Sequence, residues 1–444
     1  MRGKENPIAA KRAVVGKPRK GASPKRSVQG IVAKVTPARL AAFEILNLVG
    51  EGKGHSDELL HSTRVDALSA EDRNLTTALV MGVLRWQIAL DARVRLLLQR
   101  PDQRLPEPVA IALRIGAFQL LHMDRIPPHA ALSESVELCK VAGEPHAAGM
   151  VNAILRKVAA APRQGARPHE STAMFAERLA HPLWMVERWV KEYGRASAVK
   201  ICEADQREPV QGAMFAESGI DWPQMDDGSR LVAEIAAAAM PGAKRVWDCC
   251  AAPGGKTLVL ARRLAEAEIL ASDVSAKRLA QMEARLRRYS YAERVRVAIT
   301  DASDTKNVEG TFDLILCDAP CSGTGTLAEN PEIRHRLRLE ELSRQAERQR
   351  AILKGALKWL APGGRLVYST CSLEPEECER VAETVLRRGD VRVIPVDEIL
   401  RELGEQGIFL GGEELSLAVR EKALRTLQGV HPCDGFYAIV LERA

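Results

Sequence analysis

The stretch RVWDCCAAPGGKT (245–257) combines a short apolar strand, a glycine-containing loop and the start of a helix. The same alternation of strand, loop and helix continues toward the C-terminus. Strands are predicted at 245–249, 268–273, 294–300, 312–318 and 365–370, and helices at 257–267, 275–289, 340–360 and 375–388. This alternation predicts a parallel sheet wrapped by helices on both faces. Such sheets bind ligands beyond the carboxyl ends of their strands, which is where the glycine loop lies.

The N-terminal part of the chain has a different pattern, because residues 35–161 show helical periodicity throughout. Thr36 and Pro37 supply a helix N-cap and a proline at the first helical position. Ser69 and Asp72 resemble a capping box. The helix that they open carries one apolar face, formed by Leu75, Leu79, Val83, Trp86, Leu90, Val94 and Leu97. Further helices are predicted at 106–122, 130–142 and 146–161, so this part is expected to be a helical bundle.

Between these two parts lies a less regular segment, 162–240. It begins with a linker composition, APRQGARP, and continues with a helix predicted around 173–193. After this predicted helix, the rest of the segment shows only weak strand signals. We therefore divide the chain into a tail (1–34), a helical bundle (35–161), a connecting segment (162–240) and an α/β domain (241–444).

The charge and composition exclude several classes of protein. The net charge is +6, but residues 1–34 hold ten Lys or Arg and one acid, which is +9, so the remainder is +6 − 9 = −3. The sequence contains no run of about 18 apolar residues, so no membrane-spanning helix is predicted. The basic N-terminus is not followed by an apolar segment, which argues against a secretory signal. Nine cysteines without framework spacing indicate reduced thiols and a cytoplasmic protein.

The glycine loop narrows the choice of cofactor. A phosphate-binding P-loop needs glycine where this chain has Cys250, and the G-x-G-x-x-G pattern of dinucleotide folds is also absent. Asp273 and Asp301 follow the second and third predicted strands, where a carboxylate can accept hydrogen bonds from ribose hydroxyls. Each aspartate alone could equally cap a helix or turn. Together they favour a nucleoside cofactor without a phosphate chain, such as S-adenosylmethionine.

Two cysteines follow neighbouring strand ends of the predicted sheet. Cys321 comes after the strand 312–318, and Cys371 comes directly after the strand 365–370. A buried structural thiol is the most common state of a single cysteine. Zinc is not supported by a C-x-x-C pair or a histidine cluster, so no metal is predicted. A disulfide is disfavoured by the compartment, and a further interpretation is a nucleophile with an assisting thiol.

Four motifs carry a family resemblance. DCCAAPGGKT (248–257), DAPCSGTGTL (318–327), YSTCSLEPEE (368–377) and CDGFYAIVLER (433–443) closely resemble RNA cytosine-5 methyltransferases of the Sun/Fmu type. In the helical part, LTTALVMGVLRWQIALD (75–91), RIGAFQLLHMDRIPPHAALSESVELCK (114–140) and GMVNAILRKV (149–158) resemble the domain shared with the antitermination factor NusB. The resemblance covers about 37–160 and 225–443.

The resemblance implies a fold and a reaction. The expected fold is an all-α NusB-like bundle followed by a Rossmann-like, class I S-adenosylmethionine-dependent methyltransferase domain. The expected reaction methylates C5 of a cytosine in 16S ribosomal RNA, with RNA as the partner and no membrane involved. In the family's pattern Cys371 is the nucleophile that bonds to C6, Cys321 assists release of the product, and Asp318 lies near N3 of the base.

The same resemblance maps the S-adenosylmethionine contacts onto Cys250, Ala251, Ala252, Pro253, Gly254, Gly255, Lys256, Asp273, Asp301 and Asp318. It also places the loop AENPEIRHR (328–336) near the RNA, with Asn330, Pro331 and Arg334 as candidate contacts.

The chain departs from the family in the connecting segment, which is too short for the usual RRM-like lobe. We therefore expect a shortened lobe within 162–240. This difference leaves two rival functions open. One keeps the chemistry and takes transfer RNA as substrate, and the other is a non-catalytic RNA-binding assembly factor.

The basic tail generates a first prediction. Deleting residues 1–34 removes a charge of +9, so the RNA affinity is expected to fall and the dependence of log K on log salt to become shallower. Filter binding at several salt concentrations measures both quantities. An unchanged affinity and salt slope would show that the tail does not contact RNA.

Overall fold

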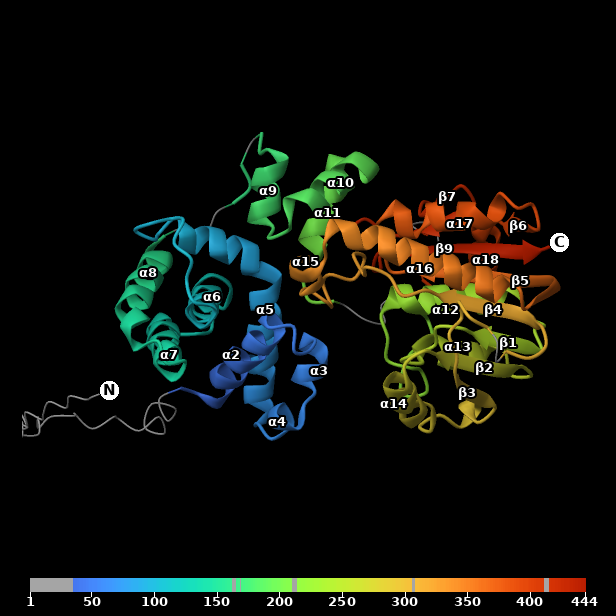
Figure 1. Cartoon of the computed structure of the whole chain (residues 1–444), viewed down its shortest axis with the longest axis horizontal. Helices are drawn as coiled ribbons and strands as arrows, with labels where there is room; N and C mark the ends of the chain where they lie inside the picture. The colour runs from blue at the N-terminus through green and yellow to red at the C-terminus, as the bar shows by residue number, and fades with distance from the viewer. Residues whose placement is uncertain (1–34, 162–164, 168, 210–213, 306–307, 411–414) are drawn as a thin grey trace, which may run out of the picture.

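The computed structural model describes residues 35–161, 165–167, 169–209, 214–305, 308–410 and 415–444. These residues form two large parts, a helical bundle and an α/β domain, as Figure 1 shows. A small group of helices lies where the two parts meet (Figure 1). The predicted fold class is confirmed.

The helical bundle follows the predicted pattern. Its helices are α2 (Pro37–Gly50), α3 (Ser56–Leu60), α4 (Thr63–Asp66), α5 (Ala70–Arg95), α6 (Glu107–His122), α7 (Pro128–Val141), the short 3₁₀ turn η1 (Pro145–Ala147) and α8 (Ala148–Ala160). The backbone N–H of Asp72 donates to Ser69 Oγ at 3.1 Å, which is the predicted N-cap of α5. Leu79, Val83 and Leu90 of the predicted apolar face are buried in the centre of the bundle.

The α/β domain is built on one mixed sheet, whose strand order is β3-β2-β1-β4-β5-β9-β8-β7, with β6 paired to β9. The strands are β1 (Arg245–Asp248), β2 (Glu268–Asp273), β3 (Val295–Ile299), β4 (Phe312–Asp318), β5 (Leu360–Thr370), β6 (Val391–Ile394), β7 (Val419–Arg420), β8 (Ala423–Arg425) and β9 (Tyr437–Arg443). β1 to β5 run parallel to one another, and β9 runs antiparallel to β5. The carboxyl ends of β1, β2, β4 and β5 therefore lie along one edge.

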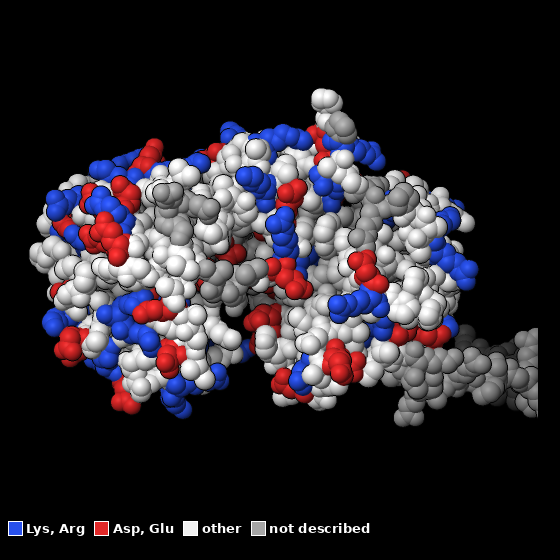
Figure 2. Space-filling view, turned by 180° about the vertical axis from the view of Figure 1, so that it is seen from behind, with Lys and Arg blue, Asp and Glu red and all other residues white. Residues whose placement is uncertain are grey.

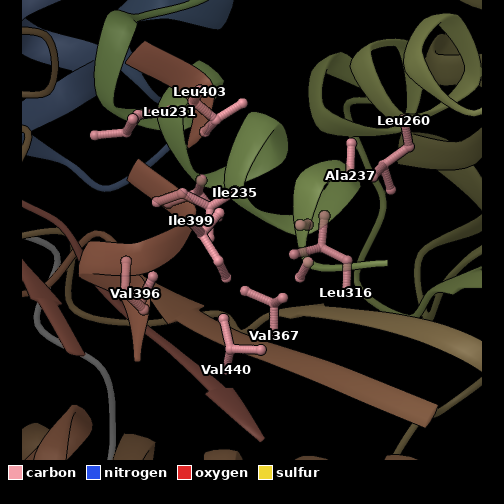
Figure 3. Packing of buried hydrophobic residues seen from close by; sticks show 14 of the residues in the cluster. Leu231, Ile235, Ala237, Leu260, Leu316, Val367, Val396, Ile399, Leu403 and Val440 are labelled. Carbon is pink, nitrogen blue, oxygen red and sulfur yellow. The ribbon is translucent and has the colours of Figure 1, made fainter. Parts of the chain in front are cut away.

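Helices cover both faces of this sheet. On one face α12 (Asp227–Ala239), α13 (Gly255–Arg263) and α18 (Val396–Glu405) pack against β4, β5 and β9. Figure 3 shows this core, in which Ile235, Leu260 and Ile399 point toward Leu316 and Val367 of the sheet. The opposite face is covered by α16 (Leu339–Leu357) and α17 (Glu379–Leu386). Two further elements, α14 (Ala276–Leu286) and η2 (Ser290–Ala292), follow β2.

The connecting segment differs from the prediction. It forms α9 (Thr172–Arg178), α10 (Leu183–Tyr193) and α11 (Arg195–Ala204), and the described residues between α8 and β1 contain no strand beyond an isolated bridge between Phe215 and Phe409. The prediction of weak strands in a shortened RRM-like lobe is therefore wrong for the described residues. α12 also belongs to the α/β domain, because it packs against the sheet, so this domain begins before residue 241.

Two predicted helices are interrupted. The helix around 173–193 breaks because Ala180 has a left-handed φ of 57° and Pro182 disfavours helical backbone at the residue before it. The helix at 375–388 is split into the 3₁₀ turn η3 (Pro375–Glu377) and α17. Here the Tyr368 hydroxyl donates to the carbonyl of Glu377 at 2.6 Å. In a continuous helix this carbonyl would accept a hydrogen bond from a backbone N–H instead.

The loop 328–336, which contains α15 (Ile333–Arg336), joins the bundle to the α/β domain. Arg334 is only 2% exposed, and its guanidinium donates to the carbonyl oxygens of Arg85 (3.0 Å), Ala180 (3.2 Å), Asp205 (3.4 Å) and Leu327 (3.4 Å). Burial lowers the pKa of Arg334 to about 10, so it still carries its charge at neutral pH.

Other residues of this loop also bind the bundle. Glu332 accepts hydrogen bonds from the backbone N–H and the hydroxyl of Ser56, and Arg336 donates to the carbonyls of Val49 and Gly54. In the opposite direction, the Arg85 guanidinium donates to the carbonyl of Ala328 at 2.7 Å. The prediction of Arg334 as an RNA contact is wrong, because the bundle and the connecting helices enclose it.

The buried guanidinium generates a second prediction. Arg334→Met should lower the free energy of unfolding by about 3 kcal/mol, because it leaves buried carbonyl groups without donors. Urea unfolding followed by circular dichroism measures the change. Arg344→Met, at an exposed position on α16, is the control and should stay within about 0.5 kcal/mol of the parent. Equal stability of both variants would contradict the role of Arg334 at the junction.

Candidate active site

The strand ends bring the predicted site residues to one edge of the sheet. Asp248 ends β1, Asp273 ends β2, Asp318 ends β4 and Thr370 ends β5. β4 and β5 are adjacent, with Asp318 opposite Ser369. The glycine loop leaves this edge between β1 and α13, and the two cysteine loops leave it after β4 and β5.

The backbone of the glycine loop is held against the sheet. The N–H of Ala251 donates to the carbonyl of Ser272 at 2.8 Å, and the N–H of Gly254 donates to the carbonyl of Ala251 at 2.7 Å. Gly254 has a φ of 94°, and a Cβ atom there would lie 2.8 Å from Met282. Only glycine fits this position without strain. The loop can therefore present its backbone to a ligand.

A cleft with a volume of about 920 Å³ lies above the loop. One wall comes from the α/β domain and the other from α5 of the bundle. Of the predicted cofactor contacts, the residues that line the cleft are Cys250, Ala251, Ala252, Pro253, Gly255, Lys256 and Asp318. The bundle contributes Asn74, Thr77, Ala78, Met81 and Arg85. This space is large enough for a nucleoside cofactor together with a substrate base.

Asp248 on the wall of this cleft is suited to a ligand. It is buried, and its Oδ2 accepts a hydrogen bond from the Thr257 hydroxyl at 2.6 Å. Its Oδ1 is buried and has no hydrogen bond of ordinary geometry within the described residues. Burial raises the pKa of Asp248 to about 7, although the Thr257 hydrogen bond acts in the opposite direction. A donor on the cofactor, such as the ammonium group of S-adenosylmethionine, would satisfy this oxygen.

Two of the predicted cofactor aspartates are engaged elsewhere. Asp273 is buried, accepts a hydrogen bond from the N–H of Ser275 at 2.9 Å and pairs with Arg278 at 3.1 Å. Asp301 is exposed, and it accepts hydrogen bonds from the N–H (2.8 Å) and hydroxyl (2.6 Å) of Ser303. Asp301 thus caps its own turn, which is the alternative role that the sequence left open. Neither aspartate lines the cleft.

An ion pair connects the glycine loop to β4. Lys256 Nζ lies 2.8 Å from Asp318 Oδ2 and donates to Ser229 Oγ at 3.1 Å. The other carboxylate oxygen of Asp318 accepts a hydrogen bond from Ser369 at 2.7 Å. Burial would lower the pKa of Lys256, but Asp318 and Asp226 outweigh that effect and raise it. Lys256 therefore remains a cation in the floor of the site.

The two predicted catalytic thiols face each other beside this ion pair. Cys321 Sγ lies 3.3 Å from Cys371 Sγ, and both residues are half-buried. The loops are also joined through their backbones, because the N–H of Gly325 donates to the carbonyl of Cys371 at 2.9 Å. Contact with Cys371 and burial raise the pKa of the Cys321 thiol well above its ordinary value.

Sequence reasoning missed several residues of the cleft. Met225, Asp226, Ser229 and Arg285 line it beside the glycine loop. Asp226 caps α12 by accepting a hydrogen bond from the N–H of Ser229 at 2.6 Å, and its motif DDGS is a recognisable helix start. Among the RNA-contact candidates, Asn330 lines the cleft, whereas Pro331 is buried. The contribution of α5 has no local signal in the sequence.

The described part of the chain contains no cluster of three or more residues that could hold a metal ion. None of its helices is long and apolar enough to cross a membrane. On the face seen in Figure 2, basic and acidic side chains are interspersed and do not form one large basic patch.

Comparisons with known proteins agree with this geometry. The family model described as 16S rRNA methyltransferase RsmB/F matches residues 238–442, and the NusB family model matches residues 36–160. The ribosomal RNA small subunit methyltransferase B of Xanthomonas campestris pv. campestris is 30% identical, covering 92% of this chain and 97% of that protein. The protein of the same name from Klebsiella pneumoniae is 29% identical, covering 80% of this chain and 90% of that protein.

A solved structure supports the fold alone. The crystal structure of PH0851 has a TM-score of 0.64 at 20% identity and covers 92% of this chain and 99% of that chain. The predicted resemblances to Sun/Fmu-type methyltransferases and to NusB are confirmed, and S-adenosylmethionine is the cofactor that the family uses. The chain belongs to the RsmB/F family of S-adenosylmethionine-dependent methyltransferases, with a NusB-family domain at its N-terminal side.

Proposed function

We propose that this protein methylates C5 of a cytosine in 16S ribosomal RNA, through a covalent bond between Cys371 and C6 of the base. The observation that carries the proposal is the distance of 3.3 Å between the sulfurs of Cys321 and Cys371, beside Lys256 and Asp318. The names of the family model and of the related proteins support ribosomal RNA as the substrate class. The NusB-family domain favours the same RNA over transfer RNA.

Two thiols suit this reaction because C5 of cytosine is a poor carbon nucleophile. In the proposed first step, the Cys371 thiolate adds to C6 while N3 gains a proton from solvent, and the electrons of the C5–C6 double bond shift to the C4–C5 position, which makes C5 electron-rich. Asp318 is placed to accept a hydrogen bond from the N3–H that forms and so to stabilise the protonated base during addition. Lys256 holds Asp318 in position through the ion pair of 2.8 Å. Bound S-adenosylmethionine supplies the methyl group as an electrophile.

Release of the product needs a base next to the nucleophile. In the proposed second step, Cys321 acts as a thiolate, after loss of its own proton to solvent, and takes the proton from C5. The C5–C6 double bond re-forms, the C6–S bond breaks with its electrons returning to the Cys371 sulfur, and N3 loses its proton. Because C5 and C6 are bonded neighbours, a sulfur 3.3 Å from the Cys371 sulfur is within reach of the C5 proton. The raised pKa of Cys321 makes its thiolate a stronger base for this step.

One experiment separates the proposal from its rivals. The full chain is incubated with total RNA and S-adenosylmethionine labelled on the methyl group, and the label is mapped. Label at C5 of a cytosine in 16S ribosomal RNA supports the proposal. Label in transfer RNA instead supports a transfer RNA methyltransferase with the same chemistry. Tight RNA binding without any label supports a non-catalytic assembly factor.

The nucleophile role of Cys371 generates a third prediction. Cys371→Ala should lower methylation of ribosomal RNA by more than about 1,000-fold, because the covalent route is lost. S-adenosylmethionine binding, measured by calorimetry, should stay within about threefold of the parent, since the glycine loop is unchanged. Cys139→Ala, which changes a buried thiol in the distant bundle, serves as the control. Parental activity in Cys371→Ala would exclude it as the nucleophile.

The release role of Cys321 generates a fourth prediction. Cys321→Ala should trap the protein on RNA after methyl transfer, because the C5 proton has no base to accept it. A denaturing gel with labelled RNA measures the retarded species. The double variant with Cys371→Ala should show none, because the bond to C6 cannot form. A gel without any retarded species for Cys321→Ala would argue against this role.

A further inference from the structure

A buried carboxylate lies behind the two cysteine loops. Glu377, in η3, is completely buried. Its Oε1 accepts hydrogen bonds from the backbone N–H of Ser322 at 2.9 Å and from Gln349 Nε2 at 3.0 Å. Its Oε2 accepts from the Ser372 hydroxyl at 2.6 Å and from the Ser322 hydroxyl. We call this set of four side chains the Glu377 bridge.

The Glu377 bridge includes the residues that directly follow the two proposed catalytic cysteines. Ser322 directly follows Cys321, and Ser372 directly follows Cys371. One carboxylate therefore binds the residue after each thiol, and the two hydroxyls are also 3.1 Å from each other. Any shift of one loop relative to the other must break a hydrogen bond to a buried charge, which costs more than breaking a neutral hydrogen bond.

Residues outside the two cysteine loops also hold the Glu377 bridge in place. Gln349 lies on α16 and also donates to the carbonyl of Pro320, just before Cys321, at 2.9 Å. The Tyr368 hydroxyl holds the backbone carbonyl of Glu377 itself. Glu377 is thus anchored to the helix and the strand that flank the site, and not only to the two loops.

The charge of Glu377 also acts on the thiols. The pKa of Cys321 is raised by contact with Cys371, by burial and by the charge of Glu377. On the opposite side, Lys256 of α13 lies near Cys371, with Asp318 of β4 as its partner. The negative group behind Cys321 opposes the formation of a second negative charge on that sulfur.

We propose that Glu377 is a positioning residue for methyl transfer, which holds the two cysteine loops together and so keeps the two sulfurs in contact. This inference rests on the proposed function, because it assigns a use to the two thiols. A purely structural role would instead make Glu377 important for folding and leave the turnover of the folded enzyme unchanged.

The test compares two neighbouring carboxylates. Glu377→Gln keeps the size of the side chain and removes its charge. Glu376→Gln is the matched control, because Glu376 pairs with Arg188 and Arg380 outside the bridge. Glu377→Gln should lower kcat for RNA methylation by about 100-fold, with KM for RNA and for S-adenosylmethionine within about twofold of the parent. Glu376→Gln should retain the parental kcat.

A second readout needs neither RNA nor cofactor. The folded protein is treated briefly with iodoacetamide, and alkylation of Cys321 and Cys371 is quantified by peptide mass spectrometry. In the parent, Cys371 should react faster than Cys321, and Glu377→Gln should reduce this preference by about tenfold. This measurement remains informative about the bridge even when Cys371→Ala contradicts the proposed function.

Three outcomes would overturn the inference. They are a kcat of Glu377→Gln close to the parental value, an equal loss in Glu376→Gln, and an unchanged alkylation preference. If Glu377→Gln does not fold, Ser372→Ala tests the same bridge by removing one donor. It should lower kcat by about tenfold with KM unchanged, and parental kcat in this variant would also overturn the inference.

Discussion

The site depends on the parallel pairing of β4 with β5. This pairing sets Asp318 opposite Ser369 and lets the N–H of Ala319 donate to the carbonyl of Ser369 at 2.9 Å. Two loops that leave adjacent parallel strands begin at the same edge, so their first residues are forced into proximity. The 3.3 Å contact between Cys321 and Cys371 follows from that register. The glycine loop, on the other side of β4, then brings the cofactor cleft to the same place.

The loop that carries Cys321 also connects the two parts of the molecule. It continues into residues 328–336, where Arg334 binds carbonyl groups of the bundle, the connecting helices and the α/β domain. The connecting helices hold the other cysteine loop, because Trp189 of α10 donates to Glu374 at 3.1 Å and Arg188 pairs with the same carboxylate at 2.6 Å. A segment that is too short for the family's usual lobe therefore still supports both thiols.

Much of the fold could be predicted because its signals are local. Alternation of apolar strands with helices located β1 to β5, and the Ser69 cap located the start of α5. The cysteine pair was predictable as a motif. Side-chain partners were not, because they depend on tertiary placement. A strand-end aspartate looks the same whether it lines the cleft, as Asp318 does, or is paired with an arginine away from it, as Asp273 is. Arg334 likewise resembled a solvated RNA contact, since nothing in its sequence reveals the surrounding carbonyls.

The wall that α5 contributes to the cleft has a consequence for the strength of charge interactions there. With both walls present, the side chains of the Lys256–Asp318 ion pair are only 14% and 24% exposed, so the effective dielectric constant around the pair is lower than that of bulk water. Cutting the chain after the bundle would remove none of the reacting side chains, yet it would expose them to solvent on one side. The isolated α/β domain would then have weaker electrostatic interactions between the same residues, so under the proposed mechanism the two parts act as one unit.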